Sequence, residues 1–151
     1  MVVSSIYIFE SQKIKSMLEK VVVNIYYTGN NFNAYAPDLT GCVSTAATLN
    51  EKKKNIKEAI EFHIESSIAN NETIPDIFKG DYELEYILST EALLNAYSDI
   101  FTKAALSRIT GINERQLWHY ASGMRKPRPA QRKRIEEGLH RLGAELLALN
   151  V

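Results

Sequence analysis

The sequence predicts an α+β fold, in which a small βββαβ domain precedes an all-α domain. Runs rich in β-branched and aromatic residues occur before Ser89, whereas the remainder of the chain has helical spacing. The charge also changes sign between these two parts. We therefore expect domains over residues 20–89 and 90–151, preceded by an arm over residues 1–19. No Gly/Ser linker separates the two domains, so the boundary should be tight.

The elements of the first domain follow from turn residues that alternate with strand-like runs. In the arm, residues 2–9 could form a short strand and residues 14–19 a helical turn. Beyond it, Gly, Asn, Pro and Asp mark the turns, because they tolerate turn backbones. The expected strands are residues 21–27, 32–36, 42–46 and 82–89.

One helix should follow the third strand and cover one face of the sheet. Thr48 and Glu51 form a capping box at its start, and Asn70 and Asn71 end it. Its apolar stripe has spacings of three and four and consists of Ile56, Ala59, Ile60, His63, Ile64 and Ile68. Its charged residues should lie mostly on solvated faces; they are Lys52, Lys53, Lys54, Glu58, Glu61 and Glu65.

The second domain begins with two expected caps, Thr90 for a helix over residues 91–98 and Thr102 for the next helix. Residues 102–123 then meet the requirements of two helices that cross at a tight turn. The residues that would face the shared core are Leu106, Ile109, Leu117 and Tyr120. Gly111 can adopt positive φ in the turn, and Asn113 can cap the second helix.

In the same segment, Ile112 would fill the corner between the helices, and Gly123 would end the second helix. Through these residues the segment resembles the phage-repressor (Cro/C1) type of helix-turn-helix, which binds DNA. An ordinary helical hairpin is the alternative.

The second helix of such a domain enters the major groove with its N-terminal residues foremost. The residues then nearest to base edges are Glu114, Arg115, Gln116 and His119. Arg115 suits guanine and Gln116 suits adenine, whereas Glu114 could accept from cytosine or favour the helix N-terminus. The residues expected at phosphates are Lys103, Arg125, Lys126 and Arg128, and a solvated basic surface is their alternative interpretation.

Trp118 occupies a position that is usually polar in this repressor pattern. We expect it in the core or in a dimer seam, in preference to stacking on nucleic acid. The helix after Pro129 offers apolar surface for such a seam, through Ile135, Leu139, Leu142, Leu146 and Leu147. We therefore expect a homodimer or tetramer on a palindromic operator.

Composition limits the remaining function classes. The 151 residues are 45% hydrophobic and 24% charged, as in ordinary globular proteins. No apolar run could span a bilayer, and the N-terminus lacks the features of a signal peptide. Cys42 is the only cysteine, so we expect a cytoplasmic protein without membrane attachment. The three scattered histidines predict no metal site; His63 should be packed and His140 at the surface.

The net charge of zero hides an asymmetry between the two parts of the chain. Residues 1–98 carry 8 Lys/Arg and 13 Asp/Glu, a net charge of −5. Residues 99–151 carry 10 Lys/Arg and 5 Asp/Glu, a net charge of +5. The basic part suits a polyanion, and the acidic part suits a basic protein. Mutual attraction between the two parts is the alternative.

The first domain also contains a recognisable motif. A β-hairpin is followed by Tyr35-Ala-Pro37-Asp38-Leu39-Thr40-Gly41-Cys42, then by Thr48-Leu49 and a helix with Ile56-Lys-Glu58-Ala59-Ile60. Through these residues the domain resembles the HicB antitoxin family. Thr40 stands where the family commonly has Pro, and residues 52–54 are lysines where it has acidic residues and Ala.

This resemblance implies a fold similar to part of ribonuclease H and a small basic messenger-RNA ribonuclease toxin of the HicA type as partner. The chain would silence that toxin and repress the shared operon. A stand-alone repressor, whose first domain senses a ligand or drives oligomerisation, is the alternative. A nuclease would need convergent carboxylates that hold metal ions, so we expect no enzyme, catalytic residue or cofactor.

Overall fold

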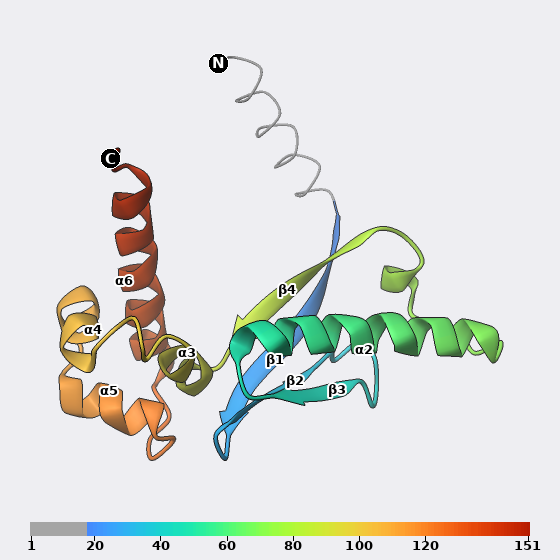
Figure 1. Ribbon diagram of the computed structural model, residues 1–151, viewed down its shortest axis with the longest axis horizontal. Coiled ribbons are helices and arrows are strands. Elements are labelled where there is room, and N and C mark those ends of the chain that lie inside the picture. The colour runs from blue at the N-terminus through green and yellow to red at the C-terminus, as the bar shows by residue number, and fades with distance from the viewer. Residues whose placement is uncertain (1–17) are drawn as a thin grey trace. The chain divides into compact units, whose positions relative to one another are not determined.

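The computed structural model describes residues 18–151, which divide into two compact units between Ile87 and Leu88 (Figure 1). We call residues 18–87 the N-terminal unit and residues 88–151 the C-terminal unit. The strand expected within residues 2–9 lies outside the described residues, as does most of the helical turn expected from residue 14. Glu19, expected to end that turn, instead begins the first strand, because the β-branched run that follows extends back to it.

The N-terminal unit is a four-stranded sheet with one long helix, so the predicted βββαβ order is confirmed. The strands are β1 (Glu19–Thr28), β2 (Asn31–Tyr35), β3 (Val43–Ala46) and β4 (Tyr82–Leu88). Their spatial order is β3-β2-β1-β4, and both pairings within β1–β3 are antiparallel. In Figure 1 β4 runs in the same direction as β1. β3 and β4 are therefore the two edges of the sheet.

A two-residue turn sets the register of the first hairpin. Gly29 and Asn30 both have positive φ, 58° and 70°, which matches the twist of the strands they join. Val21, Val23 and Ile25 alternate along β1 and are almost completely buried. The opposite face of the sheet is open enough to leave Tyr26 and Tyr35 about two-fifths exposed, at 43% and 42%.

Helix α2 (Leu49–Ala69) begins and ends as predicted. The Thr48 hydroxyl accepts from the Glu51 N–H at 3.2 Å, and Asn70 is the C-cap. The buried line along the helix is Leu49, Lys52, Ile56 and Ile60. The prediction that Lys52 is solvated is therefore wrong, because spacings of three and four place it on the covered stripe.

Ile68 departs from the predicted stripe in the opposite sense, with 58% of its surface exposed. It lies in the last turn of α2, which in Figure 1 extends past β2 and β3. The short 3-10 helix η1 (Asp76–Phe78) then leads to β4, and Phe78 packs edge-on against Tyr82 at 5.3 Å.

The C-terminal unit contains four helices: α3 (Thr90–Ala96), α4 (Lys103–Thr110), α5 (Glu114–Ala121) and α6 (Pro129–Leu147). Their shared core consists of Leu94, Leu106, Ile112, Leu117, Tyr120, Ala121 and Ile135. The predicted cap of α3 is wrong by one residue. Ser89 has an extended backbone and accepts from the Ala92 N–H at 3.1 Å, whereas Thr90 is already helical and the helix ends at Ala96.

The connection between α4 and α5 is as tight as the sequence predicted. Thr102 caps α4, Gly111 follows it with φ 68°, and Asn113 caps α5. Two arginines of α6 bind the carbonyls at the end of α4: Arg134 donates to Gly111 and Arg141 to Ile109, both at 2.8 Å. The exposed carbonyls of that helix end thus gain cationic partners.

Candidate functional site

The solvent-facing side of α5 carries two of the four residues expected at base edges. Burial of Leu117, Tyr120 and Ala121 orients the helix, so Glu114 and Arg115 are exposed. The side chain of Asn113 accepts from the Arg115 N–H at 2.9 Å and sets the start of the helix. The other two, Gln116 and His119, lie on the same helix but are half-buried.

Three of the four cations expected at phosphates follow α5 directly. Arg125, Lys126 and Arg128 are exposed in the segment between α5 and α6, where the Arg125 N–H donates to the His119 carbonyl at 3.1 Å. The C-terminal unit as a whole carries 10 Lys/Arg and 6 Asp/Glu. This segment therefore adds exposed positive charge beside α5, on a unit that is itself basic.

Lys103 differs from these three cations. It is only 8% exposed, and its ammonium lies 5.2 Å from the centre of the Trp118 ring. Burial lowers the pKa of Lys103. Its side chain is thus engaged with an aromatic ring within its own unit.

Trp118 does not lie in the core, so that part of its prediction is wrong. Its side chain is 61% exposed, whereas the preceding Leu117 is fully buried. Successive helix residues are separated by about 100°, so packing of Leu117 turns Trp118 outward. The sequence could have indicated this, because Leu117 already occupied the core position of the repressor pattern.

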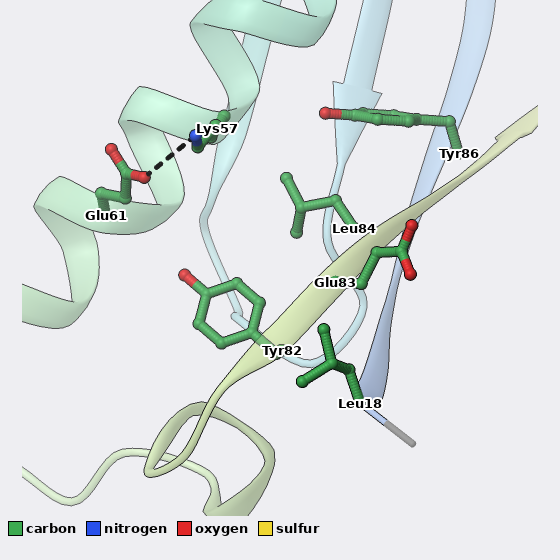
Figure 2. A pocket seen from close by; sticks show the side chains of 7 residues that line it. All are labelled: Leu18, Lys57, Glu61, Tyr82, Glu83, Leu84 and Tyr86. Atoms are coloured by element: carbon green, nitrogen blue, oxygen red, sulfur yellow. Dashed lines mark ion pairs between the residues drawn. The ribbon is translucent and has the colours of Figure 1, made fainter. Parts of the chain in front are cut away.

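A groove lies between α2 and β4 in the N-terminal unit (Figure 2). It exists because α2 packs mainly on β2 and β3, whereas it reaches β4 at Tyr86, whose hydroxyl donates to the Lys53 carbonyl at 3.4 Å. Its volume is about 420 Å³, and its lining residues are Leu18, Lys57, Glu61, Tyr82, Glu83, Leu84 and Tyr86. Sequence reasoning did not find this groove, because its walls come from elements far apart in the chain.

The two walls of the groove differ in chemistry. On α2, Lys57 and Glu61 form an ion pair at 3.8 Å, drawn as a dashed line in Figure 2. On β4, Tyr82, Leu84 and Tyr86 alternate and present aromatic and aliphatic surface. Burial and the Glu61 charge raise the pKa of Tyr82. The groove is therefore charged along α2 and mostly apolar along β4, where Glu83 adds one carboxylate.

Among residues 18–151, no group of three or more His, Cys, Asp or Glu side chains could hold a metal ion. Burial raises the pKa of the Cys42 thiol and so disfavours the reactive thiolate. Within the same range, no helix has the length and apolar character needed to cross a membrane.

The N-terminal unit matches a known family. The family model described as the HicB_like antitoxin of bacterial toxin-antitoxin systems covers residues 21–93. Residues 21–93 thus belong to the HicB-like antitoxin family. This confirms the resemblance inferred from the motif at Pro37, Asp38 and Leu39. The HicB-like domain comprises the sheet and α2 and ends within α3, before α4 and α5.

Two curated relatives share part of the chain. An uncharacterized 14.9 kDa protein in the rep-hol intergenic region of Haemophilus phage HP1 is 49% identical over 39 residues, 26% of this chain and 29% of the relative. A UPF0150 protein of Synechocystis sp. is 46% identical over 44 residues, 29% of this chain and 56% of the relative. The chain thus spans less than two thirds of either relative. No solved structure matches it, so similarity of the HicB-like domain to part of ribonuclease H stays a prediction.

Proposed function

We propose that this chain is the antitoxin of a toxin–antitoxin pair, that it silences a small basic messenger-RNA ribonuclease, and that it represses its own operon. The observation that carries the proposal is the family match over residues 21–93. The charges are consistent with it. Described residues 18–87 carry 6 Lys/Arg and 11 Asp/Glu, which would attract a basic toxin and steer its approach.

The groove between α2 and β4 is the surface where we place the toxin contact. Tyr82, Leu84 and Tyr86 offer the apolar and aromatic area that the centre of a protein interface needs. Glu61 supplies negative charge at its border. β4 is also an edge strand, so a partner can approach it from the side.

We assign DNA binding to the C-terminal unit, in which α4 and α5 would be the two helices of the helix-turn-helix. Glu114, Arg115, Gln116 and His119 are the proposed base contacts, and Arg125, Lys126 and Arg128 the proposed phosphate contacts. A homodimer or tetramer would bind a palindromic site, because one recognition helix covers too few bases for selectivity. Leu146 and Leu147 near the end of α6 are 57% and 90% exposed, which suits a dimer seam. A chain that stays monomeric on DNA would contradict this part.

The test is co-expression with a small basic protein encoded by the neighbouring gene. We expect co-purification and rescue of growth. Leu84→Arg should abolish both, since it places a long cation in the groove. Val43→Arg is the matched control, because Val43 is 66% exposed on the opposite edge strand. Circular dichroism checks that each variant folds. Glu61→Arg reverses a charge at the border of the groove and leaves every residue of the sheet unchanged.

The alternative is a stand-alone repressor whose N-terminal unit drives oligomerisation. The open face of the sheet favours it, because Tyr26, Tyr35 and Val43 are exposed there and the two tyrosine rings lie 6.3 Å apart. Under this alternative no neighbouring protein co-purifies, and Val43→Arg dissociates the oligomer. Loss of toxin binding with Val43→Arg but not with Leu84→Arg would instead move the toxin contact to the open face.

A further inference from the structure

We propose that Trp118 is a specificity-determining residue that contacts the 5-methyl group of a thymine in the major groove, and that Lys103 positions its indole. This inference rests on the proposed DNA binding by α5 and adds a residue that the base-contact set did not contain. Its experiment therefore separates the failure of this contact from the failure of DNA binding.

The first support is the place of Trp118 on the helix. It follows Glu114 by four residues and Arg115 by three, so all three lie on one face of α5. All three side chains are exposed, and the indole is 61% exposed. An aromatic ring of this size left in water beside two exposed charged side chains indicates a contact surface.

The second support is the contact with Lys103. The Lys103 ammonium lies 5.2 Å from the ring centre, within the range of a cation–π interaction. Lys103 is 92% buried and belongs to α4, so its position is set by the packing of the unit. It thereby restricts the indole before any partner binds. A restricted side chain loses less entropy on binding.

The surroundings indicate which partner the indole meets. Arg115, Arg125 and Lys126 are exposed on or next to α5, which favours a polyanion over an apolar protein surface. Bases in an intact duplex are stacked, so the ring could stack on one only after base flipping. The apolar group that the major groove presents is the thymine methyl. The partner that the indole contacts is therefore duplex DNA with a thymine opposite Trp118.

Trp118 is the only tryptophan in the chain, so the emission of the full-length protein reports on this side chain alone. The probe is a duplex selected by the protein from a pool of random sequences. We expect tryptophan emission to change with added duplex and to saturate together with binding measured by anisotropy of a labelled DNA end. Dilution of the protein without DNA should leave the emission unchanged.

The decisive measurement replaces each thymine of that duplex by uracil, one at a time, which removes only the methyl group. At one position in each half-site the wild type should bind about fourfold more weakly, the factor expected from exposure of one methyl group. Trp118→Ala should bind thymine and uracil duplexes equally. Lys103→Met should reduce the difference, and Lys103→Arg, which keeps a cation, should preserve it.

Ile100→Ala is the matched control, since Ile100 is an apolar residue of the same unit with 66% exposure. It should keep the full thymine preference. If the selected duplex binds but emission is unchanged, or no uracil position weakens binding, the Trp118 contact is wrong while DNA binding stands. A change of emission on dilution would place Trp118 in a subunit interface, which would also overturn the proposed thymine contact. If no duplex is selected, the proposed DNA binding fails and the inference fails with it.

Discussion

Lys52 lies fully buried on the covered face of α2, and its ammonium has no hydrogen-bond partner. Burial lowers the pKa of Lys52 from 10.5 to about 8. A change of one in pKa corresponds to about 1.36 kcal/mol, so the buried cation costs about 3 kcal/mol when it is protonated. Such a cost is a large part of the stability of a small domain.

We predict that Lys52→Met stabilises the protein at pH 7 by up to about 3 kcal/mol. Between pH 8 and 10.5 the unfolded wild type holds a proton that the folded protein does not, so wild-type stability should rise with pH there. Below pH 8 both states hold the Lys52 proton, so this residue should no longer make the wild-type stability depend on pH. Urea unfolding at several pH values measures both effects. Lys54→Met, at an exposed position of the same helix, should change neither, and an equal gain there would refute the explanation.

Arg115 and Lys126 are both exposed cations, but the proposed function gives them different effects. Arg115→Ala should cost roughly 1–3 kcal/mol of discrimination between DNA sequences. Lys126→Ala should weaken binding to all sequences and lower the salt slope by about one. Titrations of selected and scrambled duplexes at several salt concentrations distinguish the two. Equal, sequence-independent losses would contradict the placement of the recognition helix.

At the scale of elements, the contact between α4 and α6 depends on a glycine. A Cβ at Gly138 would lie 2.9 Å from the Ile109 carbonyl oxygen and 3.2 Å from a methyl carbon of the same residue. Because the first obstacle is backbone, the helices themselves would have to separate. The same contact brings Arg134 and Arg141 to the end of α4.

We therefore predict that Gly138→Ala destabilises the protein by roughly 1–3 kcal/mol, as overpacking does. Gly143→Ala is the control on the same helix, because nothing lies within 4 Å of its Cβ position. It should be neutral or stabilise by up to about 1 kcal/mol, since Ala favours helix more than Gly. Thermal unfolding of both variants tests this pair, and similar destabilisation by both would argue against close helix packing at Gly138.

At the scale of the whole molecule, the chain divides between Ile87 and Leu88 into two compact units of opposite charge. The N-terminal unit has its own capped helix, sheet and buried residues. We predict that a fragment of residues 18–89 folds, co-purifies with the toxin and rescues growth. Its binding should be weaker if oligomerisation normally doubles the contacts. It should not bind DNA, because α4 and α5 are absent.

Full-length Arg115→Ala provides the converse test. It should still rescue growth but fail to repress an operon reporter. Rescue and reporter output are measured for both constructs beside the wild type. A soluble, folded fragment that neither rescues growth nor binds the toxin would remove the antitoxin role from this unit. The stand-alone repressor would then be the better explanation.

The sequence by itself determined the features that depend on neighbouring residues. Thr48, Thr102 and Asn113 cap their helices, and Gly111 takes positive φ, because each acts on backbone within three positions. The spacing of apolar residues likewise predicted the βββαβ order and the four later helices. The motif from Pro37 to Gly41 led to the family that residues 21–93 match.

Only the tertiary structure decided which surfaces are covered. Lys52 is buried and Ile68 exposed because α2 crosses the sheet near its first turns and extends past it at the end. Trp118 points outward because α5 packs through Leu117 and Tyr120. The groove at Leu84 joins strand and helix residues far apart in the chain. Burial depends on which elements meet, and such long-range contacts are set by the fold as a whole, beyond the reach of local sequence patterns.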